Sequence, residues 1–316
     1  MNSISAKLKP PSTSGSARRR ILCHLLFVLS FESSLPALTA AQPKEAPQRV
    51  ISQVPAITEI LYALGQEDRI VGVSKYCRFP PDAQNKPKIG GFHDASLESI
   101  IALKPDWIAL FQGQDELKSV LEPIGCRVFS PTMETIADVC DIIRQLGSVF
   151  GASERAEGVV ASMEKDIDAI KTSLADLPRR RTLFVVGREP GSFKGLYCVG
   201  KGGFVEEMLN AAGAESALAQ EPVGRYPILS LETLMRVDPE VILDCGASPA
   251  DVEAGRMPSE WQAFASLQAV HRNQVVPVHD DHLTIPGPSI PSSVRKLACF
   301  IHGASAEERL ASAPKE

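Results

Sequence analysis

The sequence contains one segment twice, and this repetition decides the fold. Residues 96–108 are SLESIIALKPDWI and residues 230–242 are SLETLMRVDPEVI, at a constant offset of 134 residues (230 minus 96). Each copy begins with a serine, which favours a helix N-cap, and ends in a proline turn followed by a short apolar strand. Two copies of one helix–strand unit predict two similar lobes, with a ligand cleft between them.

Strands and helices alternate on both sides of each copy. Short apolar runs at 49–54, 69–73, 107–111 and 127–129 predict four strands before residue 150, and runs at 182–186, 241–244 and 275–278 predict three after it. Such alternation favours parallel, helix-covered sheets. The predicted fold class is therefore α/β, with two Rossmann-like lobes built on parallel sheets.

A long helix is predicted between the two parts. Its apolar residues recur every three or four positions, and neither proline nor glycine interrupts residues 159–177; they are Met163, Ile167, Ile170, Leu174 and Leu177. At 1.5 Å per residue this helix is roughly 30 Å long, about the width of a small domain. The predicted organisation is a signal peptide (1–41), an N-terminal lobe (49–150), a bridging helix (151–178), a C-terminal lobe (181–302) and a C-terminal tail (303–316).

The N-terminus has the pattern of an export signal. Arg18–Arg20 precede an apolar stretch of 11 residues, Ile21–Phe31, and small residues follow up to Ala41. This stretch is too short to span a bilayer of roughly 30 Å, so we expect cleavage near Ala41 and a periplasmic protein. Sec and twin-arginine export both remain open, as does an uncleaved anchor. Cys23 lies inside the apolar stretch, so no lipoprotein attachment is predicted.

Composition argues against several function classes. The 316 residues carry a net charge of −5, which argues against a nucleic-acid partner, because phosphate binding needs a basic face. Gly200–Gly203 lack the spacing of a dinucleotide loop, and no Gly-x-Ser-x-Gly motif occurs, so neither an enzyme nor a cofactor is predicted. Six cysteines follow the signal; they permit disulfides without specifying them, and we expect mostly buried free thiols.

Aromatic and polar residues cluster in the loops near the predicted strands, where open α/β sheets bind ligands. The candidates on this ground are Tyr76, Phe92, His93, Phe111, Phe193, Tyr226 and His282. Rings from both lobes suit a large, flat, partly apolar ligand, although packing is the alternative for each ring taken alone. Cys77, His93, Asp281 and His282 are also candidates for a metal site, with polar lining of the pocket as the alternative.

Glu98 and Glu232 occupy the same position in the two copies of the repeat. An acid in the first turn of a helix is favourable by about 0.3–1 kcal/mol, which is one explanation for both. The other is that each lobe presents one acid to a two-fold symmetric partner, where paired charges would set register and steer association.

Five segments together resemble a known family. They are RVISQVPAITE (49–59), VGVSKY (71–76), GGF (90–92), ALKPD (102–106) and DDHLTIPGP (280–288). Over residues 49–302 the chain is similar to the class III periplasmic binding proteins for vitamin B12 and ferric siderophores, whose two lobes are joined by a rigid backbone helix. The resemblance implies a substrate-binding protein of an ABC importer, without enzyme activity.

The resemblance also implies roles for single residues. Glu98 and Glu232 match the acids that dock onto arginines of the permease dimer. In the B12 binders the corrin is held by aromatic residues that match Tyr76, Phe92, Phe111 and Tyr226, and the cleft is also lined at the positions of Pro55, Ala56 and Asp281.

The aromatic matches favour cobalamin or a related corrinoid as the ligand of a monomeric protein. Siderophore binders often use arginines, for which Arg188 and Arg225 are candidates. A ferric siderophore or haem is thus the first alternative, and metal-ion sensing or an enzyme on the same fold is the second.

Overall fold

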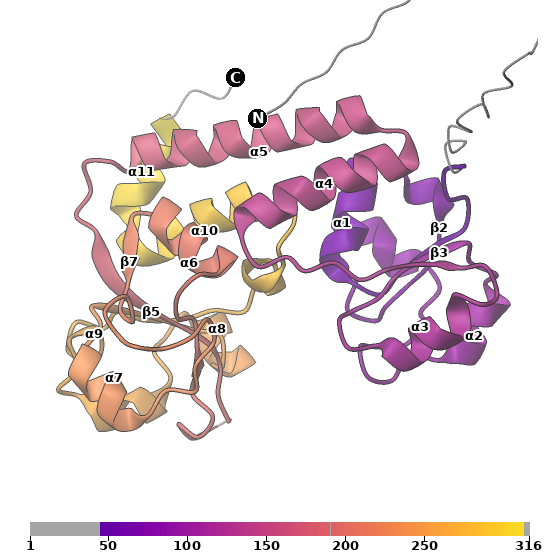
Figure 1. The fold of residues 1–316 in the computed structure, drawn as a ribbon. Helices are drawn as coiled ribbons and strands as arrows, with labels where there is room; N and C mark the ends of the chain where they lie inside the picture. The colour runs from indigo at the N-terminus through magenta and orange to yellow at the C-terminus, as the bar shows by residue number, and fades with distance from the viewer. Residues whose placement is uncertain (1–44, 190, 313–316) are drawn as a thin grey trace, which may run out of the picture. The chain divides into compact units, whose positions relative to one another are not determined.

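The computed structural model describes residues 45–189 and 191–312, which belong to one compact unit (Figure 1). The signal predicted for residues 1–41 lies outside the described residues. We call residues 45–150 the N-terminal half and residues 180–312 the C-terminal half. Within the described residues no helix is long and apolar enough to cross a membrane.

The N-terminal half contains a sheet of four parallel strands in the order β2-β1-β3-β4. Its strands are β1 (Val50–Ser52), β2 (Ile70–Val73), β3 (Trp107–Ala109) and β4 (Arg127–Phe129). β1 and β3 are completely buried, as expected for central strands of a parallel sheet covered on both faces. All four carboxyl ends therefore lie along one edge of this sheet.

The C-terminal half contains a sheet in the order β6-β5-β8-β9, with β7 also paired to β5. Its strands are β5 (Arg180–Gly187), β6 (Tyr197–Cys198), β7 (Ala214–Ser216), β8 (Val241–Asp244) and β9 (Val275–Pro277). All pairings are parallel except that of the two-residue edge strand β6 with β5. The connection between β5 and β6 is too short for the crossover that a parallel neighbour requires.

Helices surround both sheets, which confirms the predicted α/β fold class. They are α1 (Pro55–Ala63), α2 (Leu97–Ala102), α3 (Asp115–Leu121), α4 (Ile136–Phe150), α5 (Ser153–Ser173), α6 (Phe204–Ala211), α7 (Leu231–Val237), α8 (Pro249–Ala254), α9 (Gln268–His271), α10 (Ile290–His302) and α11 (Ala304–Ser312). Short 3₁₀ helices complete the chain: η1 (Glu67–Arg69), η2 (Pro81–Asn85), η3 (Ser259–Phe264) and η4 (Asp281–Thr284).

The two copies of the repeat fold alike. Ser96 caps α2 by accepting a hydrogen bond from the amide of Ser99 at 3.2 Å, and Ser230 caps α7 through the amide of Thr233 at 3.1 Å. After each helix one residue adopts a positive φ, 47° at Lys104 and 38° at its counterpart 134 positions later. The same cap, turn and strand therefore recur in both sheets, as the sequence predicts.

An arginine at the start of each sheet extends this equivalence. Arg49, just before β1, donates to the carbonyl of Leu103 at the end of α2, and Arg181 in β5 donates to the matching carbonyl of Val237. Equivalent carboxylates also bind the backbone of these arginines: Asp106 accepts a hydrogen bond from the amide of Arg49 at 3.1 Å, and Glu240 accepts one from the amide of Arg181 at 2.9 Å. These bonds fix each repeat helix against the first strand of its sheet.

Helix α5 lies within the stretch predicted to bridge the lobes. It follows α4 after Gly151, whose φ of 70° ends α4 in the left-handed conformation that glycine adopts easily. Its buried stripe includes Met163, Ile167 and Ile170, and it packs against α4, α6, α10 and α11. In Figure 1 it runs above elements of both halves.

The C-terminal stretch 303–316 contains a helix where a tail is predicted. In α11 the side chains of Ala306 and Leu310, four residues apart, are buried, and the helix packs against α5 and α10. Two buried residues are too few to give a clear periodicity from sequence alone. The six cysteines of the described region are free thiols, four of them buried.

Glu59 of α1 connects the two halves. Its carboxylate accepts hydrogen bonds from the amide and the hydroxyl of Ser289, just before α10, the second at 3.0 Å. Gly287 permits this approach, because a Cβ there would lie 2.8 Å from the Glu59 carboxylate. Burial raises the pKa of Glu59 above its usual value, although the Ser289 hydrogen bonds and His282 oppose the rise.

The raised pKa of Glu59 predicts a pH-dependent contribution to stability. Because the folded pKa exceeds the unfolded one, this contribution is fully present below about pH 4.5 and is lost as pH rises through the folded pKa. In urea unfolding between pH 4 and 8, Glu59→Gln should gain stability relative to wild type as pH rises, since it stays neutral. Ser289→Ala should lose stability more steeply with rising pH than wild type does. Parallel curves of unfolding free energy against pH for all three proteins would contradict the raised pKa of Glu59.

Candidate functional site

A cavity of about 680 Å³ is lined by residues from both halves. We call it the aromatic cavity. Its lining residues are Val54, Pro55, Ala56, Tyr76, Arg78, Phe92, Leu110, Phe111, Gln112, Pro131, Thr132, Met133, Glu134, Arg225, Tyr226, Asp281, Thr284, Ile285 and Pro286. Its volume is in the range of small-molecule sites, roughly 300–1,000 Å³.

The topology of the first sheet explains this lining. Residues 54–56 follow β1, Tyr76 and Arg78 follow β2, residues 110–112 follow β3, and residues 131–134 follow β4. Every strand of this parallel sheet therefore contributes from its carboxyl end. The C-terminal half adds the loop before α7, with Arg225 and Tyr226, and η4 with the residues after it.

Three aromatic rings form a stack on the N-terminal side of the cavity. The ring centroids of Tyr76 and Phe92 lie 4.6 Å apart, and Phe92 stacks on Phe111 at 4.6 Å with an interplanar angle of 26°. Tyr76 and Phe111 remain about two-fifths exposed, at 40% and 42%. The stack thus offers aromatic surface to a ligand, which is unusual for side chains that could have packed into the core.

Gln53 holds two of these aromatic loops together. Its side chain is completely buried; the amide nitrogen donates to the carbonyl of Gly91 at 3.0 Å, and the oxygen accepts the amide of Phe111 at 2.8 Å. Gly91 is needed for close packing, because a Cβ there would lie 2.9 Å from the ring of Tyr76. Gln53 was not among the predicted site residues, although it directly follows the first strand.

The opposite side of the cavity carries Tyr226. Its ring lies 5.8 Å from that of Tyr197, and burial raises its pKa, with the neighbouring Tyr197 adding to the rise. The phenol therefore keeps its proton at neutral pH and can donate a hydrogen bond to a ligand.

Seven predicted ligand-binding residues line this cavity together: Pro55, Ala56, Tyr76, Phe92, Phe111, Tyr226 and Asp281. Arg225, predicted as a siderophore contact, lies there too. Arg78 and Glu134, which follow β2 and β4, also line the cavity and were not predicted. The same strand-end rule that selected the aromatic residues would have found both, had it been applied to charged side chains.

Three predicted ligand residues lie elsewhere. His93 is exposed and does not line the cavity. Phe193 packs edge-on against Trp261 and Phe264, with ring centroids 4.7 Å away in both cases, and so belongs to the core of the C-terminal half. His282 lines a separate cavity of about 490 Å³, where its Nδ1 lies 3.0 Å from a carboxylate oxygen of Asp280.

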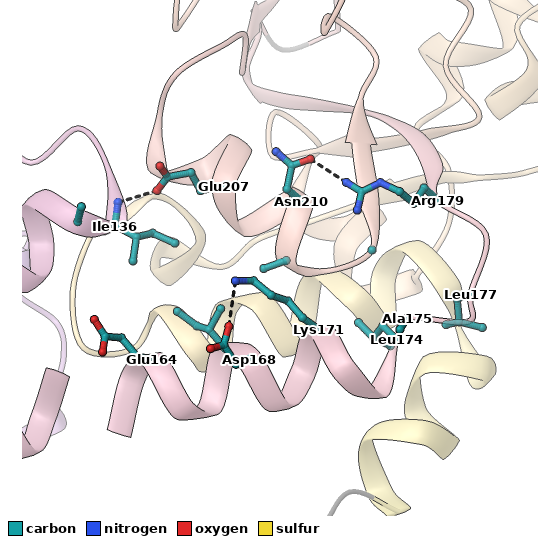
Figure 2. A pocket seen from close by; sticks show the side chains of 14 residues that line it. Ile136, Glu164, Asp168, Lys171, Leu174, Ala175, Leu177, Arg179, Glu207 and Asn210 are labelled. Atoms are coloured by element: carbon teal, nitrogen blue, oxygen red, sulfur yellow. Dashed lines mark hydrogen bonds and ion pairs between the residues drawn. The ribbon is translucent and has the colours of Figure 1, made fainter. Parts of the chain in front are cut away.

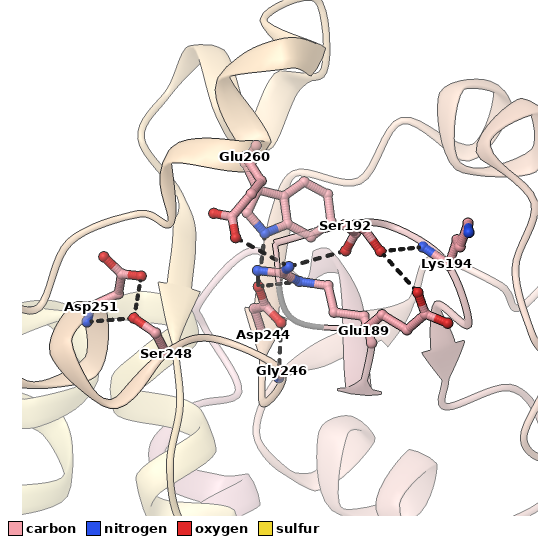
Figure 3. Close-up of polar contacts among 10 residues, drawn as sticks. Glu189, Ser192, Lys194, Asp244, Gly246, Ser248, Asp251 and Glu260 are labelled. Carbon is pink, nitrogen blue, oxygen red and sulfur yellow. Dashed lines mark hydrogen bonds and ion pairs between the residues drawn. The ribbon is translucent and has the colours of Figure 1, made fainter.

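Arg188, the other predicted siderophore arginine, is buried in the ion network around Asp244, which Figure 3 labels. Its side chain is 1% exposed and pairs at 3.0 Å with Asp244, which is 0% exposed. The indole of Trp261 donates to the same carboxylate at 2.8 Å. A guanidinium so enclosed is not available to a ligand. The proposed metal cluster is also not formed, since no three metal-ligating side chains gather anywhere in residues 45–189 or 191–312.

A second large cavity, of about 780 Å³, lies along α5 and α6 (Figure 2). Its polar side chains bind one another: Lys171 pairs with Asp168 at 3.1 Å, and Arg179 donates to Asn210 at 2.8 Å. No aromatic residue lines it, and it includes none of the predicted site residues. The aromatic cavity is therefore the better candidate for a ligand.

Comparison with known proteins identifies the family. The sequence profile of a family described as "Periplasmic binding protein" matches residues 50–281. The chain belongs to this family. The vitamin B12-binding protein of Salmonella typhi is 28% identical over 254 residues, covering 80% of this chain and 89% of the relative.

Two further similar proteins extend this comparison. The uncharacterized ABC transporter substrate-binding lipoprotein YvrC of Bacillus subtilis is 26% identical over 268 residues, covering 82% of this chain and 81% of the relative. The structure of the periplasmic haem-binding protein RhuT from Roseiflexus sp. RS-1 has a TM-score of 0.70 at 22% identity and covers 82% of this chain and 99% of its own. The resemblance stated from the sequence motifs is thereby confirmed.

These matches place this periplasmic binding protein among the substrate-binding components of ABC importers. It is an extracytoplasmic binding protein; by their names the Salmonella typhi relative binds vitamin B12 and the Roseiflexus protein binds haem. One of those relatives is a lipoprotein and another is periplasmic.

Proposed function

We propose that this protein captures a corrinoid such as cobalamin in the aromatic cavity and delivers it to an ABC permease. The observation that carries the proposal is the stack of Tyr76, Phe92 and Phe111, with Tyr226 on the other side of the cavity. Exposed rings of this kind suit the flat, apolar face of a macrocycle. The vitamin B12-binding relative supports the same ligand class.

Haem or a ferric siderophore is the second candidate. Arg78 and Arg225 line the cavity, and guanidinium groups are suited to carboxylates. Solved structures of the same fold also include haem-binding proteins. Both arginines, however, already pair with carboxylates of this chain, which favours the corrinoid.

Calorimetric titration of the purified protein with cyanocobalamin, haemin and ferric siderophores tests the ligand class. We expect one equivalent of cyanocobalamin to bind more tightly than either alternative. If haemin or a siderophore binds more tightly, that compound is the ligand and the corrinoid proposal is wrong. Turnover of a substrate without binding of any of the three would reject the whole proposal.

Replacing Phe92 with alanine should weaken cyanocobalamin binding by about 10- to 100-fold, since the central ring of the stack is a candidate hot spot. The adjacent His93→Ala is the matched control, because His93 is exposed and lies outside the cavity lining. Its affinity should equal that of wild type. Equal losses in both variants, measured by calorimetry, would show that the stack does not bind the ligand.

We further propose that Glu98 and Glu232 dock this protein onto the two subunits of the permease. Both side chains are exposed, and neither takes part in an ion pair or hydrogen bond with the other residues that the structure describes. An exposed apolar residue follows each acid three positions later: Ile101 is 45% exposed and Met235 is 40% exposed. Residues three apart share a helix face, so each half presents an acid beside an apolar side chain.

The targeting and domain predictions also stand as proposals. We propose a periplasmic monomer whose signal ends near Ala41, with lobes at 49–150 and 181–302 joined by residues 151–178. Mass spectrometry of the mature protein tests the cleavage site, and an N-terminus upstream of residue 32 would exclude it.

A further inference from the structure

Four charged side chains line the aromatic cavity, and they form two ion pairs. Arg78 lies 3.0 Å from a carboxylate oxygen of Asp281, and Arg225 lies 2.6 Å from one of Glu134. No other charged residue of the described chain lines this cavity. The net charge of the residues that line the cavity is therefore zero, and each charged side chain is paired with one of opposite sign.

Each pair joins the two halves, and the signs alternate. Arg78 and Glu134 belong to the N-terminal half, while Asp281 and Arg225 belong to the C-terminal half. Each half thus presents one cation and one anion to the other. We call these two contacts the cross-cavity ion pairs.

Further contacts hold Arg225 and Glu134 in position. The Nε of Arg225 donates to the carbonyl of Gly202 at 2.8 Å, and its side chain lies so close to Gly203 that a Cβ there would come within 3.0 Å. The carbonyl of Glu134 accepts the amide of Phe204 at 2.7 Å. This pair is less exposed than the other, at 35% and 45% against 63% and 55%, so solvent screens it less.

We infer that the cross-cavity ion pairs select a ligand that presents amides to them and reject one that presents carboxylates. This inference rests on the proposed function and narrows it to corrinoids whose peripheral groups are amides. A ligand carboxylate can bind Arg78 or Arg225 only by displacing Asp281 or Glu134, which then repels it at short range. A neutral amide rim leaves both pairs intact and can still accept hydrogen bonds from their arginines.

Two corrinoids that differ only in charge provide the test. One is cyanocobalamin, and the other is its derivative in which one peripheral amide is hydrolysed to a carboxylate. Wild type should bind the neutral form more tightly. Glu134→Gln and Asp281→Asn should each shift the affinity ratio toward the acid by about tenfold, because each frees one arginine at nearly constant volume. Added salt should reduce the shift.

Haemin, which carries propionates, provides a second readout that does not depend on corrinoid binding. The double variant Glu134→Gln/Asp281→Asn should bind haemin more tightly than wild type. Asp251→Asn is the control, since it neutralises an acid paired at 3.0 Å with Arg256, neither of which lines the cavity. It should change neither the corrinoid ratio nor haemin affinity. Circular dichroism should show all variants folded.

The outcomes separate the two proposals. If neither carboxylate variant shifts the corrinoid ratio and the double variant gains no affinity for haemin, the inference is overturned. Equal binding of both corrinoids by wild type also overturns it. If no form binds cyanocobalamin but the double variant gains affinity for haemin, the selection by ion pairs stands and the corrinoid proposal falls.

Discussion

Reversing the two acids proposed to dock onto the permease, with Glu98→Arg and Glu232→Arg, is expected to reduce ligand uptake strongly while leaving ligand affinity unchanged. Uptake should fall at least about 100-fold, because the introduced arginines would face the arginines expected on the permease. Like charges facing each other across an interface cost several kcal/mol. Ligand affinity should not change, since neither residue lines the aromatic cavity. The measurement is transport of radiolabelled cyanocobalamin into proteoliposomes that contain the permease, beside calorimetry on the free protein.

The matched control reverses two acids elsewhere. Glu154 at the start of α5 and Glu308 in α11 are both exposed, and their replacement by arginine makes the same change in net charge. This control should transport nearly as well as wild type. Equal losses of uptake in both double variants would show that the effect comes from the change in net charge and not from docking. Normal uptake by Glu98→Arg/Glu232→Arg would remove the docking role.

Removing the buried carboxylate of Asp244 should produce the largest loss of stability. Asp244→Ala is expected to lower the free energy of unfolding by about 3–5 kcal/mol, since it leaves a buried guanidinium without its counter-ion. One carboxylate oxygen accepts from Arg188 at 3.0 and 3.1 Å and from Trp261, and the other accepts the amide of Gly246 at 2.9 Å. Figure 3 shows Asp244 at the centre of these contacts.

Urea unfolding followed by tryptophan fluorescence measures this loss. Asp168→Ala is the comparison, because Asp168 forms an exposed i,i+3 pair with Lys171 and such pairs contribute less than about 1 kcal/mol. A small loss in Asp244→Ala, similar to that of Asp168→Ala, would mean that Arg188 finds another partner. Glu260, 3.6 Å from Arg188, is the nearest candidate.

The repeat allowed much of the fold to be predicted from sequence. Its serine caps, proline turns and buried strands are local features, so Ser96 and Ser230 mark the same unit in both sheets without any tertiary information. The antiparallel pairing of β6 and the burial of α11 could not be predicted in this way. Both depend on partners far along the chain, β5 and α5, whose contacts leave no periodic signal in such short elements.

The site was predictable only as far as the strand-end rule reaches. That rule places a residue near the ligand edge of a sheet but does not fix where its side chain points. Tyr76 and Phe193 both follow strands, yet Tyr76 lines the cavity while Phe193 packs against Trp261, 68 residues later in the sequence (261 minus 193). In the same way, sequence alone could not show that Arg188 is buried against Asp244 while Arg225 lines the cavity.

The likeness of the two halves has a kinetic consequence. Because α2 and α7 have the same serine cap, a positive-φ residue at the equivalent position and the same anchoring arginine, a two-fold symmetric permease would meet nearly the same surface on either half. Rotating this protein by 180° about the two-fold axis of the permease would then give a second orientation in which it can bind. Under the docking proposed for Glu98 and Glu232, association in either orientation would lead to delivery, so productive association would be about twice as fast as for a binding protein with one productive orientation.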